Sequence, residues 1–310
     1  MSAPGVAIHT TAFARAAVGD NRHVYTSIQG TSFSSPIVAG AAGLLRSIDP
    51  GLTQAQVRAG LKAAVDDISD RNPAFLNRLG TGRLNMAKLL PKPDKWSVPE
   101  ILPELVDALN IAEVGDEVAV AASMTLTEQV RLPSKDVIIN GGYDDTFTTR
   151  DPVNNRTLVD VTGSGQPAVR TVSGNVTNAL VFDGFEITGG DALQNFQPGE
   201  GYFGGGILVT GGAAPTFRNC LVTGNIAGES NQAGGGGAVA VLDASPVFED
   251  VIISGNSSSQ GSGVYVYRGS PTFRRVTVEN NTSYGTGFGL DPKGGGMFFL
   301  DDAGKRAGII

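Results

Sequence analysis

The chain has 310 residues, a net charge of −7 and 43 glycines, and charged residues make up only 17% of it. Lysine and arginine form no cluster, which argues against nucleic-acid binding, and no run of about 20 apolar residues predicts a membrane span. The single cysteine, Cys220, excludes an intramolecular disulfide framework. The length favours two domains, and the glycines crowd between 141 and 296, so we expect the two halves to differ in kind.

The first ninety residues have a mixed α/β pattern. Val6–Thr10 predicts a short strand. Phe33–Arg46 is almost wholly small or apolar, and a helix that is apolar on all sides must be buried on all sides. Thr53 and Gln56 then have the spacing of a capping box. Apolar residues at i, i+4 spacing follow over 57–65 and predict a second, amphipathic helix.

The middle of the chain changes character at a proline-rich stretch. Residues 91–98 predict a linker. Residues 99–112 have one more helical pattern of apolar residues, and beyond it come the β-rich stretches Glu117–Ala121 and Val137–Asn140. No further helical period appears after residue 112, so we expect the rest of the chain to be all β.

The second half of the chain repeats itself. Similar nine-residue segments begin at Phe182, Phe217, Phe248 and Phe273. A second track of four-residue segments begins at Gly206, Gly237, Gly263 and Gly296. Two short strands in each repeat, joined by glycine-rich turns, predict the coils of a parallel β-helix.

Equivalent residues of stacked coils should form ladders, because neighbouring coils lie about 4.8 Å apart. We expect the four phenylalanines to stack inside, and Cys220 to lie in the core as a small apolar residue. The next position alternates in charge along Asp183, Arg218, Glu249 and Arg274. An amide ladder is expected for Asn225, Asn256 and Asn281. The helix at 99–112 would cap the first coil, and we expect the solenoid to be incomplete at its C-terminal end.

The segment from Gly30 to Gly40 carries the chemistry. Ser32 follows Gly30 and stands where the apolar helix begins, so small neighbours leave its hydroxyl open to a substrate. At a helix N-terminus, free N–H groups and the helix dipole stabilise an oxyanion. The alternative interpretation is purely structural, because serine is also a common helix N-cap.

This segment resembles the serine block of the subtilisin-like proteases (subtilases), in which Gly-Thr-Ser is followed by a hydrophobic residue, two small residues and proline. The resemblance implies that Ser32 is the nucleophile and that its backbone N–H is one oxyanion donor. Gly30, Thr31 and Pro36 form the supporting motif. One departure is Ile37, which stands where the family commonly has histidine.

The resemblance extends along the first part of the chain. Ala3–Val6 resembles the strand before the serine block, 52–65 the helix after it, and Gly80–Asn85 the closing segment. Residues 1–90 therefore resemble the C-terminal part of a subtilase catalytic domain. Its fold class is partial α/β, with no metal or other cofactor implied.

The family's other catalytic groups have no counterpart here. The resemblance implies a triad aspartate, a triad histidine and an oxyanion-hole asparagine upstream of the serine. His9 lies in the predicted strand and His23 in a polar stretch that predicts a solvated loop, and neither matches a catalytic position. A serine without a base is a weak nucleophile, so we expect this chain alone to be inactive. A gene fragment or a late start explains this most simply, and a natural degenerate protein is the alternative.

Residues 99–310 resemble the right-handed parallel β-helix (pectate-lyase-like) repeats of bacterial surface and secreted proteins. Together the resemblances imply a serine-type endopeptidase acting on protein or peptide substrates, secreted or at the cell surface. The β-helix would bind a surface or a polysaccharide. Met1–Gly5 shows no signal-peptide pattern, so the location rests on the resemblance.

Two other functions stay open. One is a β-helix adhesin or cell-surface protein that carries a vestigial protease segment. The other is a polysaccharide-acting β-helix enzyme that uses the charged residues of the ladder Asp183, Arg218, Glu249 and Arg274. The structural interpretation of that ladder is favoured, because alternating signs stabilise stacked coils.

Overall fold

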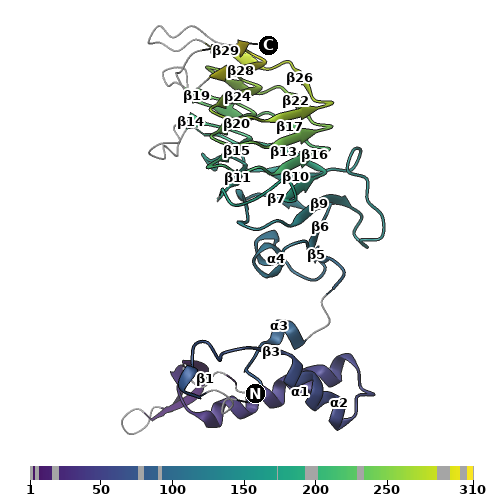
Figure 1. Ribbon diagram of the computed structural model, residues 1–310, viewed down its shortest axis with the longest axis vertical. Coiled ribbons are helices and arrows are strands. Elements are labelled where there is room, and N and C mark those ends of the chain that lie inside the picture. Colours follow the sequence, from purple (N-terminus) through teal and green to yellow (C-terminus); the bar gives the residue numbers. More distant parts are fainter. Residues whose placement is uncertain are drawn as a thin grey trace. The chain divides into compact units, whose positions relative to one another are not determined.

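A computed structural model describes residues 3, 7–15, 21–75, 80–89, 93–172, 174–192, 202–228, 234–284, 294–300 and 306–309. For 9–15, 21–25 and 306–309 it describes the backbone alone. The chain divides into two units, residues 1–93 and 94–310 (Figure 1). Among the described residues, no helix is long and apolar enough to span a membrane.

In its described residues, the first unit contains one hairpin, three α-helices and one short sheet. Its elements are β1 (Ile8–Arg15), β2 (Asn21–Ile28), α1 (Thr31–Ile48), α2 (Gln54–Ala63), β3 (Val65–Asp66), the 3-10 helix η1 (Pro73–Phe75), β4 (Arg83–Leu84) and α3 (Met86–Leu89). β1 pairs antiparallel with β2, and β3 pairs antiparallel with β4. The polar stretch at His23 is thus part of a strand, and the prediction of a loop there is wrong.

The helix α1 forms as predicted, but most of it is not covered by the described residues. Ala41 is its one buried residue, while Leu44 is 36% exposed. Gly40 and Gly43 face open space, since a Cβ at either would meet no atom within 4 Å. α2 and α3 cover one side of α1 through a small cluster that includes Val57. The prediction that α1 is buried on all sides therefore does not hold within the described residues.

The capping box predicted at the start of α2 is present. Gln56 Oε1 accepts a hydrogen bond from the Thr53 amide at 2.9 Å, and the Gln56 amide donates to Thr53 Oγ1 at 3.3 Å. Val57 and Leu61 are buried, as the i, i+4 pattern predicts. The local sequence thus determines this helix.

Asp66 of β3 binds three side chains that lie in and after β4. Its carboxylate accepts hydrogen bonds from Asn85 Nδ2 at 2.9 Å and from Arg83 at 3.2 Å, and it pairs with Lys88 at 3.0 Å. These contacts hold the pKa of Asp66 well below its ordinary value, and the hydrogen bond from Asn85 contributes most. Gly82 is required beside it, because a Cβ there would lie 2.3 Å from the Asp66 carbonyl oxygen.

The second unit is a stack of coils built on three sheets, in which all strands are parallel except β29. The first sheet contains β5 (Trp96–Val98), β6 (Glu117–Ala121), β9 (Ile138–Tyr143), β12 (Val181–Asp183), β16 (Thr216–Arg218), β21 (Val247–Glu249) and β25 (Thr272–Arg274), in that order. The second contains β7 (Thr125–Leu126), β10 (Thr157–Asp160), β13 (Phe185–Thr188), β17 (Leu221–Thr223), β22 (Ile252–Ser254) and β26 (Thr277–Glu279). The third contains β8 (Val130–Leu132), β11 (Val169–Thr171), β15 (Ile207–Thr210), β20 (Val239–Leu242), β24 (Val264–Tyr267), β28 (Met297–Leu300) and β29 (Arg306–Ile309).

Short strands in the turns extend the stacking. They are β14 (Tyr202–Phe203) with β19 (Gly234–Gly235), and β18 (Ile226–Ala227), β23 (Ser257–Ser258) and β27 (Thr282–Ser283). The architecture is therefore the parallel solenoid that the repeats predict, and its β-strand periodicity continues from coil to coil.

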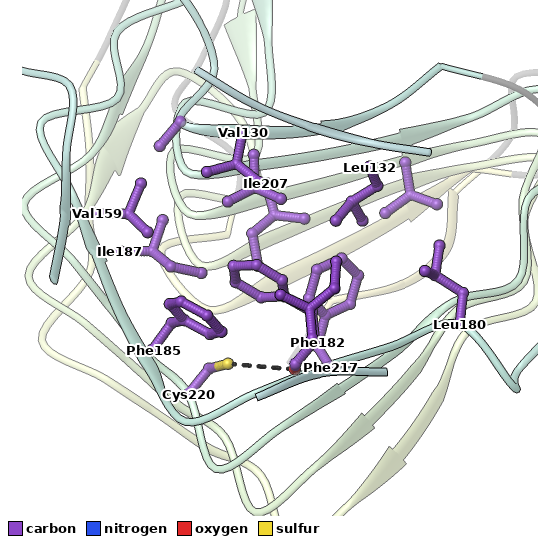
Figure 2. Packing of buried hydrophobic residues seen from close by; sticks show 14 of the residues in the cluster. Val130, Leu132, Val159, Leu180, Phe182, Phe185, Ile187, Ile207, Phe217 and Cys220 are labelled. Carbon is purple, nitrogen blue, oxygen red and sulfur yellow. Dashed lines mark hydrogen bonds between the residues drawn. The ribbon is translucent and has the colours of Figure 1, made fainter. Parts of the chain in front are cut away.

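The predicted phenylalanine ladder is confirmed in its register, but one pair of rings does not stack: Phe182 meets Phe217 edge-on at 6.1 Å and stacks on Phe185 instead. Phe182, Phe217 and Phe248 are fully buried and in register on β12, β16 and β21. The rings of Phe217 and Phe248 stack with centroids 5.3 Å apart, and Phe273 continues the column at 5.4 Å from Phe248. Figure 2 shows Phe182, Phe185 and Phe217 pointing into one interior together with Cys220. Burial raises the pKa of the Cys220 thiol to about 12.

The predicted asparagine ladder is also confirmed. Asn225 Nδ2 donates to Asn256 Oδ1 at 3.0 Å, and Asn256 Nδ2 donates to Asn281 Oδ1 at 2.9 Å. Asn225 and Asn256 are at most 1% exposed. Each buried amide thus finds its partners on the next coil, which removes the free-energy cost of burying it unpaired.

The charged ladder is in register, but its ion pairs differ from the prediction. Arg218 Nε lies 2.8 Å from Asp183 Oδ2, as expected for neighbouring coils. Glu249, however, pairs with Arg275 at 2.8 Å and not with Arg274. Arg275 also contacts Asp250, so one guanidinium satisfies two carboxylates, an arrangement that a single-residue ladder does not offer.

The second repeat track is shifted by one residue in one coil. Ile207 pairs with Val239 rather than with Ala238, and Val239 pairs in turn with Val264. A slip of one residue exchanges the inner and outer faces of a strand. The larger Val239 side chain therefore takes the core position that the sequence alignment gave to Ala238.

The cap of the first coil is shorter than predicted. The helix α4 spans Leu105–Ile111 and not 99–112. Pro103 disfavours helical backbone at the residue before it, so the helix begins after it. Leu105, Ala108 and Leu109 are buried in the core cluster of the solenoid, and α4 thus covers its first coil.

The boundary between the two units also differs from the expected linker. Residues 96–98, which were expected to lie in that linker, form β5 and pair with β6 in the first sheet. The solenoid therefore begins earlier in the sequence than residue 99. The expectation that it continues past the end of the chain stays a prediction.

Candidate active site

Ser32 lies in the first turn of α1, where the chain leaves β2. Gly30 precedes the helix with φ 153°, a backbone conformation that L side chains rarely adopt, so glycine is required there. The Phe33 amide donates to the Gly30 carbonyl at 3.1 Å. Among the described residues, the amides of Thr31 and Ser32 make no hydrogen bond. Two N–H donors are therefore free beside the Ser32 side chain, which is exposed.

Pro36 lies inside α1. An unbroken α-helix would place an N–H at this position to bond the carbonyl of the residue four before it, which is Ser32. Proline has no N–H, so the Ser32 carbonyl receives no such bond. The serine and the proline of the motif are thus related by the helix geometry.

Ser34 connects this turn to the start of the chain. Its hydroxyl donates to the Ala3 carbonyl oxygen at 3.1 Å. Residues 4–6, the rest of the segment that resembles the family's preceding strand, lie outside the described residues. Within what is described, the start of the chain and the serine turn are therefore adjacent.

The histidines are placed by their backbone alone. His9 pairs with Ser27 in the hairpin of β1 and β2, and His23 pairs with Phe13. Among the described side chains, no acid or base forms a hydrogen bond with the Ser32 hydroxyl. The turn thus provides a hydroxyl and oxyanion donors, while the described residues supply no proton acceptor.

The charged ladder of the solenoid is satisfied internally. Asp183 is 1% exposed, and its carboxylate contacts Arg150 at 2.9 Å, Arg218 at 2.8 Å and Asn219 Nδ2 at 2.9 Å. A carboxylate with this many donors and no access to solvent is not available as a general base. Arg150 was missed by the sequence analysis, because it comes from a loop outside the repeated segments.

No metal centre is formed by the described residues, since they contain no group of three or more His, Cys, Asp or Glu that could hold an ion. The asparagines and the charged residues predicted to form ladders contact neighbouring coils. Ser32 remains the candidate nucleophile.

Comparison with known proteins finds a family match in each of the two units. Residues 1–82 match the subtilase family (peptidase S8), and residues 153–302 match the right-handed β-helix region. The first part of the chain is thus similar to subtilases and the second part to right-handed β-helices, as predicted.

Among individual proteins, subtilisin DY from Bacillus licheniformis is 40% identical over 68 residues, which is 22% of this chain and 22% of that protein. The chain therefore spans about a fifth of the length of the curated relative it matches. No solved structure matches the chain.

Proposed function

We propose that residues 1–90 act as the serine-bearing part of a subtilisin-like serine endopeptidase, with Ser32 as nucleophile. The observation that carries this proposal is the free pair of amides at Thr31 and Ser32 beside an exposed hydroxyl. In acyl transfer the hydroxyl oxygen attacks the peptide carbonyl, and the carbonyl oxygen becomes an oxyanion. Amide N–H groups directed at that oxygen stabilise the transition state.

The uncovered surface of α1 supports the same proposal. The helix is apolar on nearly all sides, yet Ala41 is its one buried residue. Covering such a helix needs further apolar elements. We propose that a polypeptide segment outside 1–310 covers α1 and supplies the histidine and aspartate that activate Ser32. The chain as given would then be inactive by itself.

A fluorophosphonate probe, which modifies activated serines, tests this proposal. The chain of residues 1–310 should not be labelled. A chain extended at its N-terminus by the part of subtilisin DY that precedes the matched stretch should be labelled, and Ser32→Ala should abolish the labelling. Ser35→Ala is the matched control, because it removes an exposed hydroxyl of the same helix start. Labelling of 1–310 alone, or of the extended Ser32→Ala variant, would contradict the proposal.

We further propose that the β-helix binds a cell surface or a polysaccharide, and that the protein acts outside the cell. The saturated contacts of Asp183 favour binding over polysaccharide cleavage by the ladder. Sedimentation of the full chain with insoluble polysaccharides tests the binding. Release of cleaved sugars in the same samples would contradict a purely binding role.

A further inference from the structure

A groove lies at the end of the β-helix, where α4 packs on the first coil (Figure 1). Its volume is about 690 Å³, which is within the range of ligand-binding sites. α4 lines one side with Val106 and Leu109, and the segment 124–131 lines the other. Val106 and Val172, which also line it, are 53% and 47% exposed. The groove is thus a concave surface with an apolar wall that is open to solvent.

The charged side chains of the groove balance one another. Its lining contains two carboxylates and two cations, which belong to Glu104, Glu128, Arg131 and Lys135. The four formal charges therefore sum to zero. The Lys135 ammonium is already bound, because it donates to two backbone carbonyl oxygens at the end of α4. A ligand with a large net charge would be attracted by one pair of side chains and repelled by the other, so the lining favours a neutral ligand.

The groove also contains donors and acceptors that no described protein group satisfies. Glu104, Glu128 and Arg131 are exposed, and within the described part of the chain their side chains form neither a hydrogen bond nor an ion pair. The hydroxyls of Thr125 and Thr127 are exposed and unbonded among the same residues. A carboxylate only accepts hydrogen bonds and a guanidinium only donates them, whereas a hydroxyl does both. A ligand that carries many hydroxyls can therefore bond to either kind of group.

We propose that this groove binds a neutral polysaccharide through a few of its sugar units. The C–H faces of the sugar rings pack on Val106 and Val172, and the ring hydroxyls bond to Glu128 and Arg131. Hydrogen bonds to such charged groups are stronger than those between neutral groups. The inference rests on the proposed binding role of the β-helix, and it gives that role a location and a class of sugar. It does not involve Ser32.

Ligand-observed NMR titrations of the full chain test the proposal. The probes are the neutral oligosaccharides cellopentaose, xylopentaose and mannopentaose, with pentagalacturonate and a chitosan pentamer as charged counterparts. We expect at least one neutral probe to bind, and to bind more tightly than either charged probe. Its affinity should be the same in low salt and in about 1 M NaCl, because screening weakens attraction between charges and the probe carries none.

Two variants and a control locate the site. Val106→Asp should weaken binding of the neutral probe about fivefold, because it replaces part of the apolar wall by a charge that must stay hydrated. Glu128→Gln should weaken it about threefold, since a carboxylate accepts stronger hydrogen bonds than an amide. Val114→Asp is the matched control and should change nothing, because Val114 is 72% exposed and lies outside the groove lining. Far-ultraviolet circular dichroism confirms that each variant is folded.

Three outcomes of these titrations would each overturn the inference. They are no binding of any neutral probe, tighter binding of a charged probe, and equal affinities of Val106→Asp and Val114→Asp. Sedimentation with insoluble polysaccharides separates these outcomes from failure of the proposed binding role. If the unchanged chain and Val106→Asp sediment equally, the sugar binds elsewhere, which overturns the groove and keeps the role. A chain that neither sediments nor binds any probe overturns both.

Discussion

The two units differ in how far their apolar side chains are buried. In the β-helix, Phe182, Phe217 and Phe248 are completely buried, and each lies between equivalent residues of the coils next to it. In the first unit, α1 is also apolar in sequence, but its surface is mostly open among the described residues. A repeat supplies its own surroundings from neighbouring copies. A central helix of a non-repetitive domain takes its surroundings from distant segments, so it cannot be complete within a part of that domain.

The largest expected effect is the loss of a ladder ring. Phe217→Ala should destabilise the β-helix by about 3–5 kcal/mol, because it leaves a cavity between Phe182 and Phe248. The single tryptophan, Trp96, lies in β5, so its fluorescence follows unfolding of this unit in urea. Leu45→Ala in the half-covered α1 is the control and should leave the Trp96 transition where it is. If both variants shifted the Trp96 unfolding transition equally, the two units would not differ in how their apolar residues contribute to stability.

A smaller effect is expected at the asparagine ladder. Asn256→Leu removes a side chain that accepts from Asn225 and donates to Asn281 and to the Val222 carbonyl. The neighbours keep buried polar atoms without partners, so we expect a loss of about 1–3 kcal/mol in the same urea experiment. Asn178→Leu, at an exposed asparagine, should stay within about 0.5 kcal/mol of the unchanged chain. A neutral Asn256→Leu would mean that the ladder does not stabilise the stack.

The smallest effect has the opposite sign. Gly43→Ala should stabilise the first unit by about 1 kcal/mol, because alanine favours helix and its Cβ enters open space. Helical circular dichroism during thermal unfolding measures this. Gly60→Ala in α2 is the control and should gain less, since its Cβ would lie 3.2 Å from Leu45 Cδ1. In the chain extended by the subtilisin DY part, the gain at Gly43 should disappear, because a segment would then cover α1. Persistence of the full gain there would argue that α1 stays uncovered.

The sequence predicted best what depends on neighbouring repeats. The phenylalanine and asparagine ladders were predictable because each residue meets its own equivalent one coil away. The position of Ser32 at the start of α1 was predictable too, because glycine, serine and an apolar run define a helix N-terminus locally.

What the sequence could not give depends on contacts between non-equivalent residues. Arg150 reaches Asp183 from a loop with no counterpart in the other coils. Arg275 takes the pairing expected of Arg274, because it can contact Glu249 and Asp250 together. The helical pattern over 99–112 was overestimated, because apolar periodicity outweighed the proline at 103. In each case the residue that decides the structure is not part of the repeat or of the apolar periodicity from which the prediction was made.

The continuous register from β12 to β25 of the first sheet also bears on how the length of this solenoid can change. Turns of unequal length are accommodated outside the sheets, while the strand positions stay aligned from coil to coil. Duplication or deletion of one entire coil therefore preserves the phenylalanine ladder, whereas a shift of one residue within a strand would exchange its inner and outer side chains. Such a scaffold can grow or shrink in whole steps of about 4.8 Å. The length of the solenoid therefore changes only by whole coils, and tandem duplication in the gene would be enough to adjust it.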